Sequence, residues 1–283
     1  MSPSAKIHSP EQDRSCTTDT TALKAAISSQ VHSPPQPRQA TLVLHPSFVT
    51  QDFDLLRFSA AAQNQLPSLD SQSTTPRSTS DSDSSSSPSP AYSTHLISSP
   101  YNTPGHYLDL APLPTPSRLF ALALTALKPT RPDYATAPYA LSLDFAAVLS
   151  LLSTLCAASR FTWPTTSFYL VTFHSQLRHG VDQDWLYKLD CESHREACES
   201  GGLLKYWFGK ADLADGGARR NLATCFWDSR ESARRGGAGE WHAKARRAGR
   251  ELYASIVFET RRFTVLEGVS GWEIGEWVEE GPR

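Results

Sequence analysis

The second half of the chain carries short hydrophobic runs with a two-residue period. Three of them are rich in aromatic and β-branched residues and end at polar or glycine-rich breaks: FYLVTFHSQL (168–177), LLKYWF (203–208) and NLATCFW (221–227). This pattern predicts three β-strands. A fourth strand is predicted over residues 255–266, and the run WEIGEW near the end of the chain indicates a further strand at a sheet edge.

Between these strands the hydrophobic positions recur every three or four residues, which predicts helices. The first covers residues 182–200 and stops at the pair Gly201-Gly202, a sequence at which helices commonly end. A short helix is predicted over 229–235, with Asp228 and Glu231 at capping-box spacing. A longer helix covers 240–253, and its inward stripe is formed by Trp241, Ala245, Ala248 and Leu252.

The element order from residue 168 is therefore strand, helix, strand, strand, helix, strand. This is the ferredoxin-like βαββαβ order, an α+β fold in which two helices cover one face of a four-stranded antiparallel sheet. The strands are apolar on both faces, since LLKYWF places Leu203 and Trp207 on one side and Leu204 and Phe208 on the other. The second face also needs a cover. We expect a second copy of the chain to supply it, so the protein is predicted to be a homodimer.

An additional strand–helix unit precedes this core. The run LFALALTAL (119–127) is apolar on both alternating faces and ends before Pro129, which predicts a buried strand. Residues 142–159 predict a helix with an apolar stripe formed by Phe145, Leu149, Leu152 and Cys156. The ferredoxin-like domain is therefore expected to span residues 117–280. This unit is the other candidate cover for the second sheet face.

Residues 1–116 have a different composition, with 15 of the 20 prolines and none of the seven tryptophans. The tract SQSTTPRSTSDSDSSSSPSP (71–90) cannot bury enough apolar surface to fold, so we expect this region to be largely disordered. Its Ser/Thr-Pro pairs are candidate sites of proline-directed phosphorylation, although Ser/Pro tracts also contain such pairs by chance. The less polar stretch 40–58 either docks on the domain or folds on a partner.

Charge and cysteine content narrow the class of protein. The chain has 27 Lys+Arg against 29 Asp+Glu, a net charge of −2, which argues against nucleic-acid or acidic-membrane binding through bulk charge. No run of 18 apolar residues predicts a transmembrane helix, and the first residues lack the apolar core of a secretory signal. Five scattered cysteines, an odd number, indicate reduced thiols. We therefore expect a cytoplasmic protein. The nucleus, which is also a reducing compartment, is the second expected location.

The candidate catalytic residues are His174 in the first sheet strand and His242 at the start of the long helix, because histidine exchanges protons near neutral pH. Each could instead be a hydrogen-bonded sheet or surface histidine. If a pocket forms between sheet and helices, its expected ligand-binding residues are Tyr206, Asn221 and Trp227. The same aromatic residues would also suit a dimer core.

Three residues at helical spacing resemble a set of metal ligands: Cys191, His194 and Cys198. The two cysteines are seven positions apart, which is about 10 Å along a helix at 1.5 Å per residue. Zinc–sulfur bonds are about 2.3 Å long, so these two thiolates cannot share one ion. We therefore expect no metal site, and the sequence identifies no cofactor.

A local surplus of positive charge raises the question of RNA binding. Residues 219–250 carry nine Lys/Arg and three Asp/Glu, and the RNA recognition motif has the same element order. In that motif the third strand carries stacking aromatics, whereas this chain has Leu222 and Thr224 at those positions. We therefore expect no nucleic-acid binding. A solvated helix face, or a site for an anionic ligand or partner, is the expected role of three arginines: Arg246, Arg247 and Arg250.

Several long runs occur in one order: FYLVTFHSQLR, SGGLLKYWFG, NLATCFWDSRESARRGG, WHAKARRAGRELY and WEIGEW. In these runs the chain resembles a family of uncharacterised fungal proteins, over about residues 117–280, although Asp228 replaces a basic residue of the family pattern. The resemblance implies a domain of the dimeric α+β barrel superfamily. That superfamily includes cofactor-free monooxygenases, haem-handling enzymes and small-molecule cyclases or dehydratases, but a shared fold does not determine the function.

The sequence leaves two functions open. The first is a small-molecule-binding or enzymatic dimeric α+β barrel protein of the cytosol. The second is a non-catalytic protein-interaction module that is regulated by phosphorylation of its disordered tail. An enzyme would need an enclosed cavity that contains His174 or His242, whereas an interaction module would have these histidines packed or solvated, with no cavity.

Overall fold

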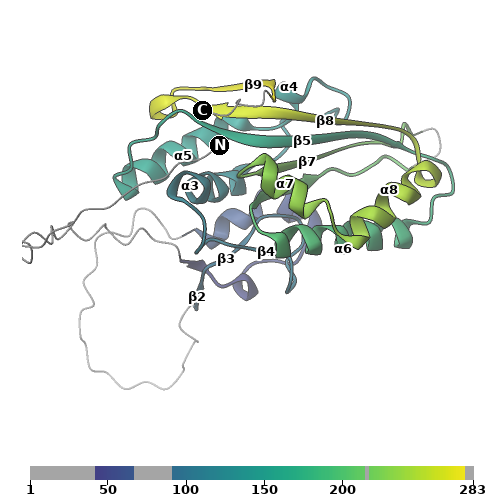
Figure 1. Cartoon of the computed structure of the whole chain (residues 1–283), viewed down its shortest axis with the longest axis horizontal. Helices are drawn as coiled ribbons and strands as arrows, with labels where there is room; N and C mark the ends of the chain where they lie inside the picture. The colour runs from purple at the N-terminus through teal and green to yellow at the C-terminus, as the bar shows by residue number, and fades with distance from the viewer. Residues whose placement is uncertain (1–41, 67–90, 214–216, 278–283) are drawn as a thin grey trace, which may run out of the picture. The chain divides into compact units, whose positions relative to one another are not determined.

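The computed structural model of the chain describes residues 42–66, 91–213 and 217–277 (Figure 1). The low-complexity tract 71–90, with the expectation that it is disordered, lies outside these residues. Within them, the Ser99-Pro100 pair is a poor kinase substrate, because Ser99 is 2% exposed and its Oγ accepts a hydrogen bond from the Tyr101 N–H. No helix in the described ranges is long and apolar enough to cross a membrane.

A five-stranded antiparallel sheet has the strand order β6-β7-β5-β8-β9. Its strands are β5 (Thr166–Leu177), β6 (Leu203–Phe208), β7 (Arg220–Trp227), β8 (Tyr253–Val265) and β9 (Trp272–Glu276). β5 lies between β7 and β8 and pairs with both along most of its length. Without β9 this is the ferredoxin-like arrangement, so the predicted α+β fold is confirmed. The edge strand expected at WEIGEW is β9, which pairs with the second half of β8.

Three helices pack on one face of this sheet: α6 (Gln183–Ser200), α7 (Arg230–Gly236) and α8 (Glu240–Leu252). α6 begins where predicted because the Asp182 carboxylate accepts a hydrogen bond from the Trp185 N–H. It ends at Gly201, whose φ of +78° is readily adopted only by glycine. α7 is capped by Ser229, which accepts a hydrogen bond from the Ser232 N–H, rather than by Asp228.

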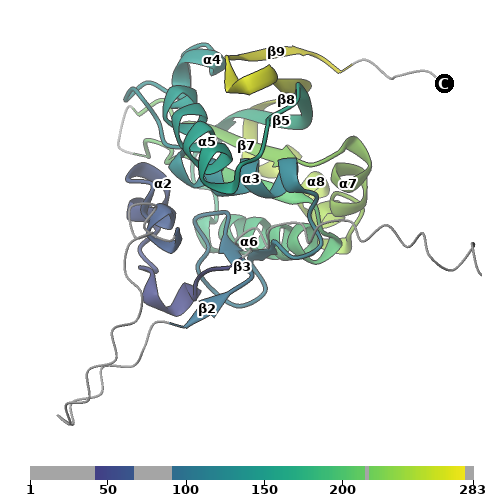
Figure 2. The ribbon, with the colours of Figure 1, turned by 90° about the vertical axis from the view of Figure 1, so that its left-hand side faces the viewer.

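The chain itself covers the opposite face, with α3 (Thr115–Ala123), the 3-10 helix η3 (Leu124–Ala126), α4 (Tyr139–Ser142) and α5 (Phe145–Ser159). Figure 2 shows α5 and α7 on opposite sides of the sheet. Phe120 of α3 stacks on Phe168 of β5 with ring centroids 4.2 Å apart, and its ring lies 5.7 Å from that of Phe263 of β8. The expectation that a second copy covers this face is therefore wrong, because the 119–159 unit covers it.

The strand predicted over residues 119–127 is also wrong, since these residues form the end of α3 and all of η3. Every residue from Leu119 to Leu127 is buried. A segment buried on all sides has no polar face, so its hydrophobic pattern does not distinguish a strand from a helix. Leucine and alanine then favour the helix. The helix predicted over 142–159 is confirmed as α5, capped by Asp144, with the separate turn α4 before it.

The described residues before 115 form short elements: β1 (Val43–Leu44), η1 (Pro46–Phe48), α2 (Phe53–Phe58), η2 (Ala61–Gln65), β2 (Tyr92–Ser93), β3 (His95–Ile97) and β4 (Tyr107–Asp109). Two buried amides join them. The Gln65 side chain bonds to backbone atoms of Leu44, His95 and Ile97, and Asn102 Nδ2 donates to the carbonyls of Pro46, Val49 and Thr50. The described part of 1–116 is therefore packed structure.

Candidate functional site

A cleft of about 1570 Å³ lies on the sheet face that carries α6, α7 and α8. Its floor includes Val171 and Phe173 of β5 and Ala223 of β7, which point to this face of the sheet. Residues of the three helices, of the segment after β6 and of the start of β8 complete the lining. Small-molecule sites usually measure about 300–1,000 Å³, so this cleft has room for an extended ligand.

Four of the five site residues predicted from the sequence line this cleft: Tyr206, Asn221, Trp227 and His242. The fifth, His174, does not. Side chains alternate along a strand, so His174 shares the face of β5 with Leu170, which packs in the core formed with α3 and α5. The structure therefore separates the two candidate catalytic histidines and leaves only His242 at the cleft.

His242 is held in place by Glu196, a residue of the neighbouring helix α6. The Glu196 carboxylate accepts hydrogen bonds from the N–H groups of Trp241 (2.7 Å) and His242 (3.1 Å), and its Oε2 lies 3.0 Å from His242 Nδ1. Glu196 thus caps the N-terminus of α8, where Gly239 has no side chain to do so. A Cβ on Gly239 would lie 2.3 Å from the Glu196 carboxyl carbon, so this approach requires glycine.

This contact sets the proton positions of the pair. Burial raises the pKa of Glu196, but the hydrogen bonds from Trp241 and His242 outweigh it and hold the pKa below its usual value. Glu196 is therefore a carboxylate at neutral pH. A carboxylate beside Nδ1 favours the neutral tautomer that carries its proton there, which leaves the lone pair on Nε2. His242 can then accept a proton from a molecule in the cleft.

Asp190 of α6 forms a second polar cluster in the lining. Its Oδ2 accepts a hydrogen bond of 2.5 Å from the Tyr101 hydroxyl, and its Oδ1 accepts one from the Tyr206 hydroxyl. Burial raises the pKa of Asp190, while the hydrogen bonds from the two tyrosines act in the opposite direction without reversing the shift. Burial also raises the pKa values of Tyr101 and Tyr206, so both hydroxyls stay protonated.

A buried histidine pair lies next to this cluster, and one of its members, His194, also lines the cleft. His106, just before β4, and His194 of α6 are 1% and 4% exposed, and their Nδ1 atoms lie 2.8 Å apart. The His194 ring also stacks on Tyr206 at a centroid distance of 5.3 Å. Burial lowers the pKa of each histidine, so the pair is neutral and one imidazole donates to the other.

No metal centre forms within the described residues, since no three His, Cys, Asp or Glu side chains converge there. The thiols of Cys191 and Cys198 contact different histidines. Cys191 Sγ lies 3.6 Å from His106 Nε2, and Cys198 Sγ lies 3.7 Å from His194 Nε2. The helical spacing of the cysteines therefore serves packing around the histidine pair.

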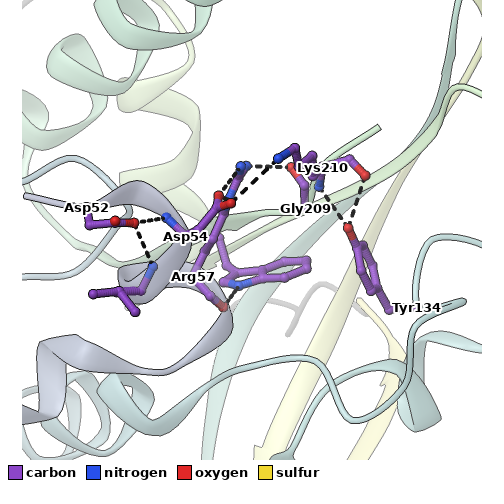
Figure 3. A network of polar contacts seen from close by, with 8 residues as sticks. Asp52, Asp54, Arg57, Tyr134, Gly209 and Lys210 are labelled. Atoms are coloured by element: carbon purple, nitrogen blue, oxygen red, sulfur yellow. Dashed lines mark hydrogen bonds and ion pairs between the residues drawn. The ribbon is translucent and has the colours of Figure 1, made fainter. Parts of the chain in front are cut away.

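Helix α2 contributes Arg57 to the lining of the cleft. Figure 3 shows the polar contacts of this residue and its neighbours. Arg57 Nη1 donates to the Gly209 carbonyl at 2.9 Å, and its Nε and Nη2 donate to Asp54. The Tyr134 hydroxyl holds the backbone of the next residue, Lys210. It accepts a hydrogen bond from the Lys210 N–H at 2.8 Å and donates one to the Lys210 carbonyl at 3.1 Å. These contacts join α2 to the segment after β6, so the stretch 40–58 docks on the domain in its described part.

The sequence did not indicate Glu196, Asp190, Tyr101 or His106 as site residues. Tyr101 and His106 lie 89 and 88 positions from their partners on α6, within the region expected to be disordered. Glu196 and Asp190 are two of several acidic residues on an exposed-looking helix. One signal in the sequence was the glycine at the start of α8. A helix without a capping side chain of its own needs a hydrogen-bond acceptor from elsewhere in the chain for the free N–H groups of its first turn.

Two solved structures show fold-level similarity. A putative antibiotic biosynthesis monooxygenase from Chloroflexus aurantiacus J-10-fl has 23% identity and a TM-score of 0.27, covering 33% of this chain and 89% of that one. A dimeric ferredoxin-like protein of unknown function from Thermobifida fusca yx has 16% identity and a TM-score of 0.27, covering 35% of this chain and 92% of that one. At these TM-scores neither carries an argument about function, and the fold assignment rests on the strand order.

Sequence comparison is more specific. The family described as PB2B2.08-like matches residues 97–276. The UPF0643 protein PB2B2.08 of Schizosaccharomyces pombe (strain 972 / ATCC 24843) is 39% identical over 181 residues, which cover 62% of this chain and 81% of that protein. The resemblance to uncharacterised fungal proteins is thereby confirmed, and its span begins before residue 117. The chain belongs to the PB2B2.08-like family.

Proposed function

We propose that the protein is an enzyme that binds a small molecule in this cleft and uses His242 as a general base. The observation that carries the proposal is that His242, which lines the cleft, has its Nδ1 3.0 Å from Oε2 of Glu196. A histidine that is oriented by a carboxylate through one nitrogen and faces a cavity is a common arrangement for proton transfer.

In the proposed reaction, His242 Nε2 removes a proton from the bound molecule. The bond from that proton to the substrate breaks, its electron pair stays on the substrate, and the resulting imidazolium is stabilised by the Glu196 carboxylate. The hydroxyl of Tyr206 is held by Asp190 and lines the same cleft, so it can orient a polar group of the substrate. The apolar floor suits a substrate with an aromatic or aliphatic body.

The alternative, a non-catalytic interaction module, would place the histidines in packed or solvated positions without a cavity. The cleft beside His242 favours the enzyme. The four cysteines of the described residues are free, which supports the cytosolic location expected from the sequence.

The test compares His242→Gln with His179→Gln, a substitution at an exposed histidine outside the cleft. Each full-length protein is incubated with a small-molecule extract of fission yeast, and changes are followed by mass spectrometry. We expect at least one compound to be consumed by the wild type and His179→Gln, and about 10²–10⁴ times more slowly by His242→Gln. Equal turnover by all three proteins, or no compound consumed by the wild type, would overturn the proposal.

We also propose that the protein is a homodimer that assembles through β8. Only Arg261–Val265 of this strand pair with β9, so within the described residues its first half has no strand on that side. Three consecutive side chains of this half are exposed: Ile256 (47%), Val257 (53%) and Phe258 (59%). An unpaired apolar edge is a template for another strand, and the same edge of a second copy is self-complementary to it. Because Ile256 and Phe258 line the cleft, a second copy would also close its open side.

A further inference from the structure

The rim of the cleft is strongly basic, although the whole chain has a net charge of −2. Two carboxylates line the cleft, Asp190 and Asp212, against seven cationic side chains: Arg57, Arg178, Lys210, Arg230, Arg234, Arg246 and Arg250. Asp190 is occupied by its two tyrosine hydroxyls. Asp54 pairs with Arg57 and Lys210, and Glu231 pairs with Arg234. The positive charge of the cleft is therefore concentrated at Arg178, Arg246 and Arg250, which favours a negatively charged ligand there.

Three of these arginines gather where α8 meets the end of β5. The backbone N–H of Arg178 donates to the Leu252 carbonyl at 2.9 Å, which places Arg178 beside the last turn of α8. Arg246 and Arg250 lie one turn apart on that helix. All three line the cleft, and Arg246 is steadied by a 2.8 Å hydrogen bond to the Gly237 carbonyl. Among the described residues, no carboxylate lies within 4.0 Å of Arg178 or Arg250.

Comparison with the neighbouring Arg247 distinguishes two interpretations of these arginines, a ligand site and an ordinary charged helix face. It lies on the same exposed helix but does not line the cleft. If the arginines served only to solvate α8 and to complement its C-terminal dipole, Arg247 and Arg250 would be equivalent in ligand binding. A ligand anion in the cleft would distinguish them.

From this arrangement we propose that the ligand of the cleft is an amphipathic organic anion. Its carboxylate, sulfonate or phosphate binds Arg178 and Arg250, and its aromatic or aliphatic body lies on the floor formed by Val171, Phe173 and Ala223. This inference rests on the proposed function, since it names the substrate class of the same cleft. The anionic group lies at the arginines, and the reacting proton lies at His242.

The experiment uses two fluorescent probes that share one aromatic body. 8-Anilinonaphthalene-1-sulfonate carries an anionic group, and N-phenyl-1-naphthylamine lacks it. Binding of each is titrated to the full-length wild type and to the variants Arg178→Gln, Arg250→Gln and Arg247→Gln. We expect Arg178→Gln and Arg250→Gln each to weaken sulfonate binding about fivefold, because each removes one partly exposed charge pair. Binding of the neutral probe should not change, and Arg247→Gln should leave both probes unaffected.

Salt gives an independent readout, because screening weakens a charge contact but not apolar burial. Sulfonate binding should weaken as the ionic strength rises, and neutral-probe binding should not. Equal effects of Arg250→Gln and Arg247→Gln, or two probes of equal affinity in the wild type, would overturn the anion site. Failure of the proposed function is distinguishable, because it appears as unchanged turnover in His242→Gln, whereas failure of the anion site appears in the probe titrations of the arginine variants.

Discussion

The contact between Glu196 and the start of α8 makes a quantitative prediction about stability. The carboxylate accepts hydrogen bonds from two backbone N–H groups and lies 3.0 Å from His242 Nδ1, and the Glu196 side chain is 19% exposed. Glu196→Gln removes the charge and keeps the shape. In glutamine an NH2 group replaces one of the two accepting oxygens, so one capping hydrogen bond is lost, at a cost of about 0.5–2 kcal/mol, and the lost interaction with the helix dipole adds about 0.3–1 kcal/mol. We expect the free energy of unfolding to fall by about 1–2 kcal/mol at pH 7.

The pH dependence has a definite sign. Because the pKa of Glu196 is lowered in the folded state, its stabilising contribution is fully present above the unfolded value of 4.5. That contribution is lost as the pH falls below 4.5 and through the lower folded pKa. The stability difference between the wild type and Glu196→Gln should therefore shrink in acid.

Urea denaturation followed by circular dichroism measures both effects. The matched control is Glu199→Gln, an exposed glutamate on the same helix, which should change the free energy of unfolding by less than about 0.5 kcal/mol. If Glu196→Gln costs no more than Glu199→Gln at pH 7, the carboxylate does not cap α8. The orientation of His242, and with it the proposed base, would then lose its support.

Three further predictions address other parts of the molecule. Phe120→Ala should lower the free energy of unfolding by about 3–5 kcal/mol, because the 0% exposed ring packs on the sheet, whereas Phe48→Ala, at 47% exposure, should cost far less by the same urea titration. In native mass spectrometry, Val257→Glu should convert the dimer to monomers, whereas Leu141→Glu, at an exposed site on α4, should leave the dimer intact. A wild-type protein that is monomeric in the same measurement would contradict the proposed dimer. The pKa values of the buried His106–His194 pair are lowered, so the free energy of unfolding should fall as the pH drops below 6.5. The double variant His106→Gln/His194→Asn should show a flatter dependence of this free energy on pH between 7.5 and 5.5. Parallel pH profiles of variant and wild type would show that the pair is not buried in the neutral form.

The sequence alone was sufficient for the ferredoxin-like core. Strands β5, β6 and β7 are short runs rich in aromatic and β-branched residues that end at polar or glycine-rich breaks. Helix α6 begins and ends at local signals, Asp182 and Gly201, that act within a few residues. Four of the five predicted site residues, His242 among them, line the cleft because strand and helix periodicity fixes which face each side chain takes. His174 lies on the other face of the sheet, because a period of two groups residues on one face but does not show which face the helices cover.

Tertiary structure decided the rest. LFALALTAL is helical, but its sequence pattern did not show this, because burial on all sides removes the polar face that distinguishes a helix from a strand. Its position on the sheet supplied the cover that a second copy was expected to supply. The contacts of Tyr101 with Asp190 and of Glu196 with His242 join residues 89 and 46 positions apart, and no local pattern encodes such distances. Hydrophobic periodicity reports the surroundings of each segment, whereas a site depends on which segments meet, and that is settled only when the whole chain packs.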